Sequence, residues 1–257
     1  MRRLLVIGIG VGDPEYVTVQ AVSALNRVDV FFVLDKGPAA RDLELARQEI
    51  LERYVAGHPY RTVTVTDPPR DRRAADYTGA VDDWRNERAL RLEQVISAEL
   101  PEHGVGGFLV WGDPSLYDGT LRVIEAILDR GELALEYDVL PGVSTIHALA
   151  ARHRVTLNRV AGAVHVTTGR RLGAHGLPDG ADDVVVMLDT ELACAKLPEQ
   201  DLEIYWGAYL GSADEILVSG RLGDVIGEIE RVRQEARDRK GWIMDSYLLR
   251  RPAAPGD

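Results

Sequence analysis

The chain of 257 residues has 41 acidic and 30 basic side chains, and its formal net charge at pH 7 is -11. So acidic a protein repels nucleic acid and anionic membranes, and we expect neither as a general partner. A single cysteine, Cys194, excludes an intrachain disulfide, and the six histidines have no metal-ligand spacing. The apolar run near the amino terminus is too short for a signal or a membrane span. We therefore expect a cytoplasmic, metal-independent protein.

Apolar runs alternate with helical patterns in the first half of the chain. This alternation predicts a mostly parallel sheet that helices cover on both sides. The predicted strands span 4–9, 28–34, 61–66, 107–111 and 133–140, and the predicted helices span 16–26, 39–54, 82–99 and 117–129.

The pattern changes after Pro141, where strands no longer alternate regularly with helices. The predicted order is a helix at 144–153, strands at 164–168, 184–188, 203–209 and 215–218, a helix at 225–240 and a strand at 242–248. The sequence thus predicts an α/β fold of two domains, 1–141 with a mostly parallel sheet and 142–257 with a mixed sheet.

The first loop, in "LLVIGIGVGDPEYVT", comes close to a dinucleotide-binding fingerprint. Gly8 and Gly10 fit the G-x-G-x-x-G pattern, but the third glycine should fall at position 13, where Asp13 stands instead. Pro14 removes an amide donor beside the point where a pyrophosphate would bind. Asp35 resembles the ribose-binding acid of such proteins, yet polar residues commonly end strands. A nicotinamide-dependent oxidoreductase is therefore disfavoured.

Two further loops have the same design. "LVWGDPSLYDGT" repeats the Gly-Asp-Pro triplet after a predicted strand, and "PGVSTIHALAA" follows another strand with a glycine turn and Ser144 as the expected N-cap. The carboxyl ends of parallel strands form the edge where such sheets bind ligands. Three glycine loops at this edge indicate a ligand site more strongly than any one of them does.

In this order and spacing, the three loops resemble the signature loops of the tetrapyrrole methylases, which are S-adenosylmethionine (SAM)-dependent methyltransferases of corrin and sirohaem biosynthesis. "VVVMLDT", "GAYLGSADEILVSGRLGDV" and "GWIMDSYLL" are similar to the closing strands of that family, so the resemblance covers nearly the whole chain. "VFFVLDKG" and "DPPRDRRAADYTGAVDDW" resemble a branch of the family that also removes an acetyl group. The resemblance implies a cofactor cleft between two α/β domains, a tetrapyrrole substrate and a homodimer.

The resemblance also implies SAM as cofactor, S-adenosylhomocysteine as its product, and a set of cofactor-binding residues. Met187 is a core strand residue in the alternative interpretation, because its segment would be buried in any case. The implied set is Val11, Trp111, Gly112, Asp113, Leu116, Ser144, Thr145, Met187 and Leu210.

Removal of an acetyl group requires a general base for water and donors to the developing oxyanion. Asp35, at the end of the second predicted strand, is the expected base, and Tyr117 is the expected proton donor or substrate contact; Tyr117 as a packing residue stays an alternative. Asp67, Asp71 and His147 are weaker candidates for the base.

A substrate with many carboxylates needs local positive charge on so acidic a protein. Guanidinium groups pair bidentately with carboxylates, and the two clusters expected to bind them, both in predicted loops, contain Arg70, Arg73, Arg170 and Arg171. Other functions stay open: another methylase of the same fold that acts on a different corrin carbon, or a module that binds SAM without catalysis.

Overall fold

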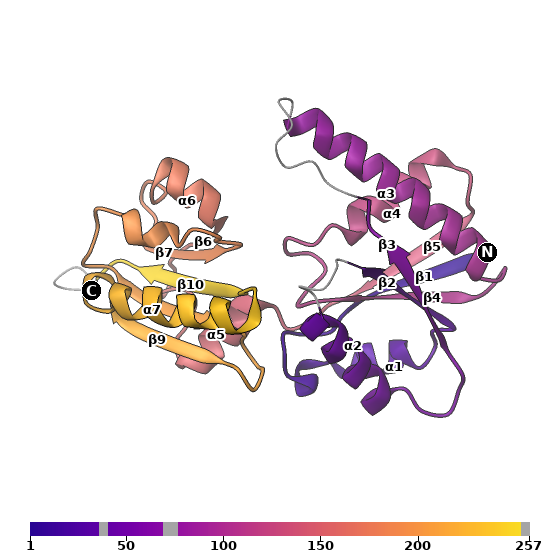
Figure 1. Ribbon diagram of the computed structural model, residues 1–257, viewed down its shortest axis with the longest axis horizontal. Coiled ribbons are helices and arrows are strands. Elements are labelled where there is room, and N and C mark those ends of the chain that lie inside the picture. The colour runs from indigo at the N-terminus through magenta and orange to yellow at the C-terminus, as the bar shows by residue number, and fades with distance from the viewer. Residues whose placement is uncertain (36–40, 69–76, 253–257) are drawn as a thin grey trace. The chain divides into compact units, whose positions relative to one another are not determined.

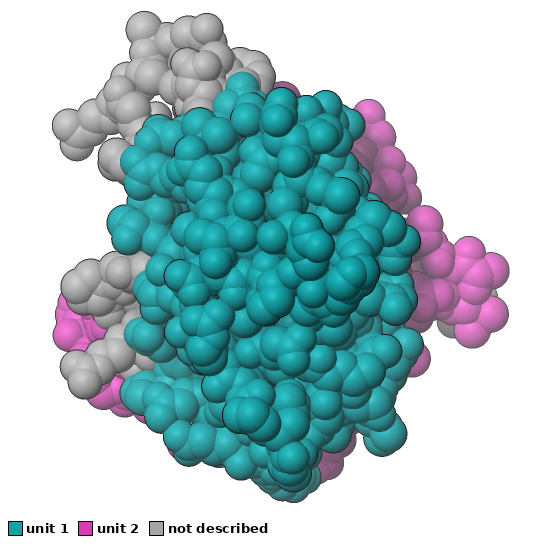
Figure 2. Space-filling model, turned by 90° about the vertical axis from the view of Figure 1, so that its right-hand side faces the viewer, with its two compact units in different colours: residues 1–10, 14–143 teal, residues 11–13, 144–257 magenta. Residues whose placement is uncertain are grey.

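The computed structural model describes residues 1–35, 41–68 and 77–252, with side chains described except at positions 35–42 and 69–83 and beyond 252. Contacts between residues divide the chain into two compact units, which have separate colours in Figure 2. The first unit comprises Met1–Gly10 and Pro14–Val143, and the second comprises Val11–Asp13 and Ser144–Asp257. Each unit contains its own five-stranded sheet.

The sheet of the first unit is parallel throughout, with the strand order β3-β2-β4-β1-β5. Apolar, β-branched stretches form its strands, as their composition predicts. The strands are β1 (Arg2–Gly8), β2 (Val30–Asp35), β3 (Arg61–Thr66), β4 (Val105–Val110) and β5 (Leu135–Leu140), and the helices are α1 (Val19–Leu25), α2 (Arg41–Tyr54), α3 (Tyr77–Glu99) and α4 (Thr120–Arg130).

Helices cover both faces of this sheet, as Figure 1 shows: α3 and α4 lie on one side, and α1 and α2 on the other. Each side has a separate core. Leu92 and Ile96 of α3 pack with Ile124 of α4 against one face, while Ala21 of α1 and Ile50 of α2 pack against the other. Burial on both faces explains why the strands are nearly continuous apolar runs rather than alternating ones.

The ladder between β2 and β4 is short. The two strands pair only at Val30↔Gly106 and Phe31↔Gly107, whereas β1 pairs with β4 from Arg3 to Gly8. Beyond that point the carbonyl of Leu109 accepts a hydrogen bond from Nε of Arg47 on α2, at 3.2 Å. An arginine thus satisfies a backbone group that the ladder leaves unpaired toward the carboxyl edge.

The sheet of the second unit is mixed, with the strand order β6-β7-β10-β8-β9. Only the β6–β7 pair is parallel; the other three pairs are antiparallel. The strands are β6 (Val164–Thr168), β7 (Asp183–Met187), β8 (Glu203–Ala208), β9 (Ile216–Arg221) and β10 (Asp245–Arg250), and the helices are α5 (Thr145–His153), α6 (Gly169–His175) and α7 (Leu222–Lys240). Short 3-10 turns lie at Pro14–Tyr16 and Ala193–Lys196.

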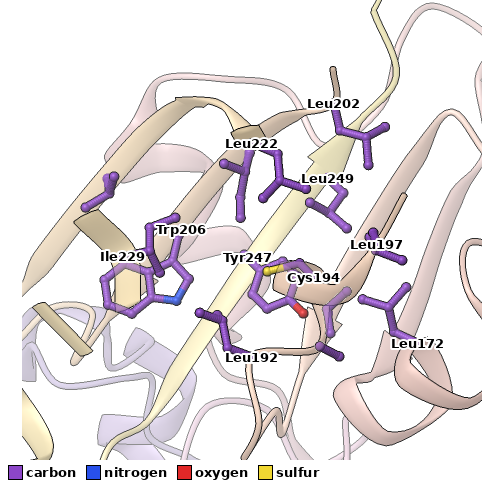
Figure 3. Close-up of a cluster of buried hydrophobic side chains, with 14 of the residues drawn as sticks. Leu172, Leu192, Cys194, Leu197, Leu202, Trp206, Leu222, Ile229, Tyr247 and Leu249 are labelled. Carbon is purple, nitrogen blue, oxygen red and sulfur yellow. The ribbon is translucent and has the colours of Figure 1, made fainter. Parts of the chain in front are cut away.

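The core of the second unit combines leucines with large aromatic residues that carry polar atoms (Figure 3). Trp206 and Tyr247 are fully buried. Nε1 of Trp206 donates to Oδ2 of Asp245 at 3.0 Å, and the hydroxyl of Tyr247 donates to Oδ2 of Asp189 at 2.6 Å. Arg233 pairs with Asp245 at 2.8 Å. These bonds satisfy polar atoms that burial would otherwise leave without partners.

The α/β class and the division into parallel and mixed sheets confirm the sequence-based predictions, but some elements differ. Arg170 and Arg171 lie in the first turn of α6, so the prediction of a loop there is wrong. α4 begins at Thr120, because Tyr117 adopts a left-handed backbone conformation that no helix contains. β9 continues to Arg221, beyond its predicted end. Within the described residues, no helix has the length and apolar character that a membrane crossing needs.

Candidate active site

The three glycine loops follow β1, β4 and β5, which are neighbours in the first sheet. These strands run parallel, so all three loops leave the sheet at its carboxyl edge. That edge is where parallel α/β sheets bind ligands. The structure therefore brings together three segments that lie far apart in the sequence.

Backbone hydrogen bonds join the first loop to the second. Gly10 N donates to Gly112 O at 3.3 Å, and Gly112 N donates to Gly10 O at 2.8 Å. Both glycines have a positive φ, 75° and 71°. A side chain at either position would strain this backbone conformation, so glycine is required at the junction.

The third loop packs against the other two so closely that only glycine fits. A Cβ at Gly8 would lie 2.6 Å from Gly142 N, and a Cβ at Gly142 would lie 2.1 Å from Gly112 O. The obstacles are backbone atoms, which cannot turn aside as a flexible side chain can. Loop-to-loop packing therefore accounts for these glycines even before a ligand is considered.

The carboxylate of Asp113 fixes the second loop to the third. Oδ1 accepts from the amide of Ser115 at 2.8 Å and from its hydroxyl, while Oδ2 accepts from Gly142 N at 2.9 Å. Asp113 was predicted to contact SAM; what the structure shows for it is a bond that orders the loops. Its contact with SAM stays a prediction.

The second loop also places two aromatic side chains in unusual situations. Nε1 of Trp111 is buried and has no hydrogen-bond partner in the described part of the chain. Tyr117 has a φ of 55° and a side chain that is 46% exposed. A non-glycine residue in this conformation costs on the order of 1 kcal/mol, and such strain is concentrated at functional sites. Leu116, between them, is half-buried.

The third loop leads into α5, where Ser144 occupies the N-cap position as predicted. Its hydroxyl makes no capping bond to the helix and instead lies 2.6 Å from Nδ1 of His147. Ser144 is 4% exposed, Thr145 is half-buried and His147 is exposed. Sequence analysis ranked His147 low, although the Ser-x-x-His spacing at a helix start places both side chains on one face.

Five residues predicted to contact SAM lie in the second unit: Ser144 and Thr145 at the start of α5, and Val11, Met187 and Leu210. Gly12 belongs to that unit as well, and a Cβ there would lie 2.4 Å from Leu210 O. The segments that contain Gly12 and Leu210 therefore adjoin each other. Val11, the neighbour of Gly12, is buried, and Leu210 is buried as well. Met187, the last residue of β7, is 9% exposed. Burial of this kind is equally typical of core residues, so the contacts stay predictions.

The structure describes only some of the predicted catalytic and substrate-binding residues. Asp35 is the last residue of β2, at the same carboxyl edge as the loops, and its side chain lies outside the described part. Arg70 and Arg73 lie outside the described residues, as does Asp71. Arg170 and Arg171 are exposed at the start of α6.

The sequence does not predict two arginines of the first unit, Arg47, which is half-buried, and Arg88, which is buried. Burial lowers the pKa of Arg47, and the carboxylates of Asp118 and Glu44 oppose that shift. Arg88 is 8% exposed, and its Nε lies 2.9 Å from Oδ1 of Asp67. Burial lowers the pKa of Arg88 too, against Asp67 and Asp118. Nothing in the sequence pattern separates these arginines from solvated ones on the same helices.

A parallel sheet with glycine loops at its carboxyl edge, in one chain with a mixed sheet, is an α/β architecture of the class that binds small ligands at that edge. A sequence model of the tetrapyrrole (corrin/porphyrin) methylases matches residues 3–226. The chain belongs to this family, which confirms the resemblance seen in the three loops.

The relatives agree over nearly the whole chain. It is 48% identical over 253 residues to a precorrin-6A synthase (deacetylating) of Sinorhizobium sp., a match that covers 98% of this chain and 97% of the relative. A cobalamin synthesis-related protein (CobF) from Corynebacterium diphtheriae has a crystal structure that is 37% identical, covers 97% of this chain and 98% of its own, and has a TM-score of 0.83.

A more distant structure shares the fold. Uroporphyrin-III C-methyltransferase from Thermus thermophilus, crystallised with S-adenosylhomocysteine, is 18% identical with a TM-score of 0.57, and the match covers 96% of this chain and 91% of that one. The predicted α/β fold with a parallel and a mixed sheet is therefore the fold of known methylases.

Proposed function

We propose that this protein is a SAM-dependent C-methyltransferase of cobalamin biosynthesis, which methylates C-1 of precorrin-5 and releases its acetyl group as acetate to give precorrin-6A. The observation that carries the proposal is the similarity to the Sinorhizobium precorrin-6A synthase, 48% identical over 98% of this chain. Membership of the methylase family supports the methyl-transfer half of the reaction independently.

SAM is the proposed methyl donor, and S-adenosylhomocysteine the product. The site fits such a ligand in one respect that the structure describes: the buried Nε1 of Trp111 needs an acceptor, and SAM has a carboxylate and hydroxyl groups that accept hydrogen bonds. A sulfonium supplies a reactive methyl group, so the protein has to position the attacking carbon and exclude water. The proposed contacts are Val11, Trp111, Gly112, Asp113, Leu116, Ser144, Thr145, Met187 and Leu210.

The proposed substrate is a tetrapyrrole with several carboxylates. A net charge of -11 makes the protein as a whole repel such an anion, so binding depends on local cations. Arg170 and Arg171 are exposed and can reach a ligand from solvent. Together with Arg70 and Arg73 they are the proposed partners of the substrate carboxylates.

The sequence-based candidates for the deacetylation are Asp35 as general base and Tyr117 as proton donor or substrate contact. The position of Asp35 at the end of β2 supports its placement at the ligand edge of the sheet. The exposed ring of Tyr117, on a strained backbone in the second loop, supports a contact with substrate.

Another methylase of the same fold, acting at a different corrin carbon, is the second candidate. It is favoured by weaker similarity to a probable cobalt-precorrin-2 C(20)-methyltransferase of Methanocaldococcus jannaschii, 27% identical over 61% of this chain. That match covers less of the chain at lower identity than the match to the deacetylating enzyme, so we prefer the first proposal.

We further propose that the protein works in the cytoplasm as a homodimer. The dimer is implied by the family resemblance, and sedimentation of the purified protein tests it through the mass in solution. The acidic surface and the single buried thiol are typical of cytoplasmic proteins.

Incubation of the protein with precorrin-5 and SAM tests the reaction. We expect acetate, S-adenosylhomocysteine and precorrin-6A in equimolar amounts. A methylated product without acetate would assign the protein to a different corrin carbon. Binding of SAM in a calorimeter without any turnover would make it a binding module.

A further inference from the structure

Ser144 and His147 form a hydrogen-bonded pair at the start of α5. A serine at the N-cap position ordinarily accepts a hydrogen bond from a backbone amide of the first helical turn. Here that bond is absent, and Oγ lies 2.6 Å from Nδ1 of the imidazole. The hydroxyl therefore orients the His147 ring and does not cap the helix.

The two members of the pair differ in their exposure to solvent. Ser144 is 4% exposed, whereas His147 is exposed. Nδ1 is occupied by the serine, and Nε2 of His147 has no partner among the described residues. Catalytic histidines are commonly oriented in this way. A buried side chain binds one ring nitrogen, and the other ring nitrogen stays accessible to the reacting group.

The pair is connected in sequence to the loops of the candidate site. Both residues follow directly on the third glycine loop, whose Gly142 amide is bound to Asp113 of the second loop at 2.9 Å. The first amides of α5, at Thr145 and Ile146, have no acceptor within the described residues, because no carbonyl of the helix can reach them. Amides in this position can stabilise a developing oxyanion.

We propose that His147 is the general base of the deacetylation and that Ser144 is its positioning residue. This inference rests on the proposed function, since it names the group that carries out one of the two chemical steps. It differs from the sequence-based choice of Asp35. A histidine suits the task because its imidazole can both take and return a proton.

The step is a hydrolysis in which bonds and charges balance. An O–H bond of water breaks and its proton goes to Nε2 of His147, while the water oxygen forms a bond to the acetyl carbon. The C–C bond to the macrocycle then breaks, and its electron pair stays on the ring carbon, which forms the new bond to the methyl group. Acetic acid leaves and ionises to acetate, and the imidazolium returns its proton to solvent. Water is the nucleophile in this step because Ser144 is too buried to reach an acyl group.

The experiment compares four proteins in the assay with precorrin-5 and SAM: wild type, His147→Gln, Asp35→Asn and the control His175→Gln. His175 is an exposed histidine at the end of α6. We expect His147→Gln to slow acetate release about 100-fold or more, with an unchanged dissociation constant for SAM. The control keeps wild-type rates. Circular dichroism verifies folding, and His147→Asn is the second variant if the first is misfolded.

Ser144 variants test the positioning role. At saturating SAM, Ser144→Ala should lower kcat for acetate release by about tenfold or more while KM for precorrin-5 stays constant, because it removes the group that orients the base. Ser144→Thr keeps a hydroxyl and should restore most of the rate. A rise in the SAM dissociation constant of Ser144→Ala, without loss of kcat at saturating SAM, would show instead that Ser144 serves the methyl donor.

The results separate this inference from the proposed function. If wild type releases no acetate, the proposed function fails. If wild type releases acetate, and His147→Gln does so at a similar rate while Asp35→Asn is inactive, the assignment to His147 is overturned and Asp35 is the base. Loss of SAM binding in His147→Gln would also overturn it, because the histidine would then act on the methyl donor.

Discussion

Gly142 fixes how the three glycine loops pack together more than its polar neighbours do. Its α-carbon faces the backbone of the two other loops, so no side chain fits there. Its amide is held by Asp113, and Gly8 and Gly112 lie within contact distance of its missing side chain. Residues that a motif search assigns to a ligand thus also hold the loops to one another. Only a measurement that separates stability from binding can distinguish the two roles.

We predict that Gly142→Ala destabilises the protein by about 3 kcal/mol or more, because the new methyl group would lie 2.1 Å from Gly112 O and the loops would have to move. Urea denaturation measures this change. Gly227→Ala is the control: it lies in α7 with open space around it, and alanine should stabilise the helix by about 0.5–1 kcal/mol. Equal stability of the Gly142 variant and wild type would contradict the packing described for the loops.

The burial of Cys194 leads us to predict that the stability of the folded protein depends on pH. Burial raises the pKa of its thiol to about 12, against 9.0 for a free thiol. The folded state therefore keeps a proton that the unfolded state releases, and stability falls as the pH rises from 9 toward 12, by up to about 1.4 kcal/mol per pH unit. Urea unfolding at pH 8.5 and 10 measures this slope.

The variant Cys194→Ala is the comparison, because it has no thiol to titrate. It should be less stable at every pH and should lose less stability between pH 8.5 and 10 than wild type does. Burial also raises the pKa of Tyr247, but an unfolded tyrosine ionises only near pH 10. If wild type and Cys194→Ala lose equal stability over this range, the thiol does not control the slope.

At the scale of elements, α3 is anchored to the end of β3 by a buried ion pair. Nε of Arg88 lies 2.9 Å from Oδ1 of Asp67, and its guanidinium stacks 4.9 Å from the ring centre of Trp84. Nε1 of Trp84 donates to Pro68 O at 2.9 Å. Asp67, a weaker candidate for the catalytic base, therefore has a structural task that the sequence did not indicate.

We predict that Arg88→Met destabilises the protein by about 3–5 kcal/mol, because it leaves a half-buried carboxylate without its counter-charge. Adding Asp67→Asn should recover part of that loss, and denaturant unfolding of both variants measures it. Arg91→Met removes an exposed pair with Glu87 on the same helix and should cost less than about 0.5 kcal/mol. Equal losses from Arg88→Met and Arg91→Met would show that burial adds nothing to the pair.

The sequence predicts the long elements because their signals are local. The buried strands are apolar runs, and α4 has an apolar face that ends at Gly131. α6 was missed because Gly169–His175 is a short segment with two glycines. In the site, the loops were predictable from their glycines, whereas the contact of Arg47 with Leu109 O depends on where the β2–β4 ladder ends, which no local pattern encodes.

At the scale of the whole molecule, the negative net charge of the protein opposes the binding of an anionic substrate. A net charge of -11 favours solubility and repels a polycarboxylate, so affinity has to come from cations close to the bound substrate. Many described arginines are already paired with carboxylates, as Arg3 is with Asp138 and Arg250 with Asp183. Exposed arginines that a substrate can contact therefore matter more than the total number of arginines.

Arg171 provides the test, because it is exposed at the start of α6 and its amide is capped by Thr168 at 3.4 Å, a contact that truncation of the side chain leaves intact. We predict that Arg171→Ala raises KM for precorrin-5 about tenfold, which corresponds to one lost charged hydrogen bond of about 1.4 kcal/mol. The SAM dissociation constant should not change. Arg231→Ala, which breaks an exposed pair with Glu235 on α7, alters the net charge equally and is the control. If both variants raise KM to the same extent, the substrate responds to overall charge, and Arg171 makes no specific contact.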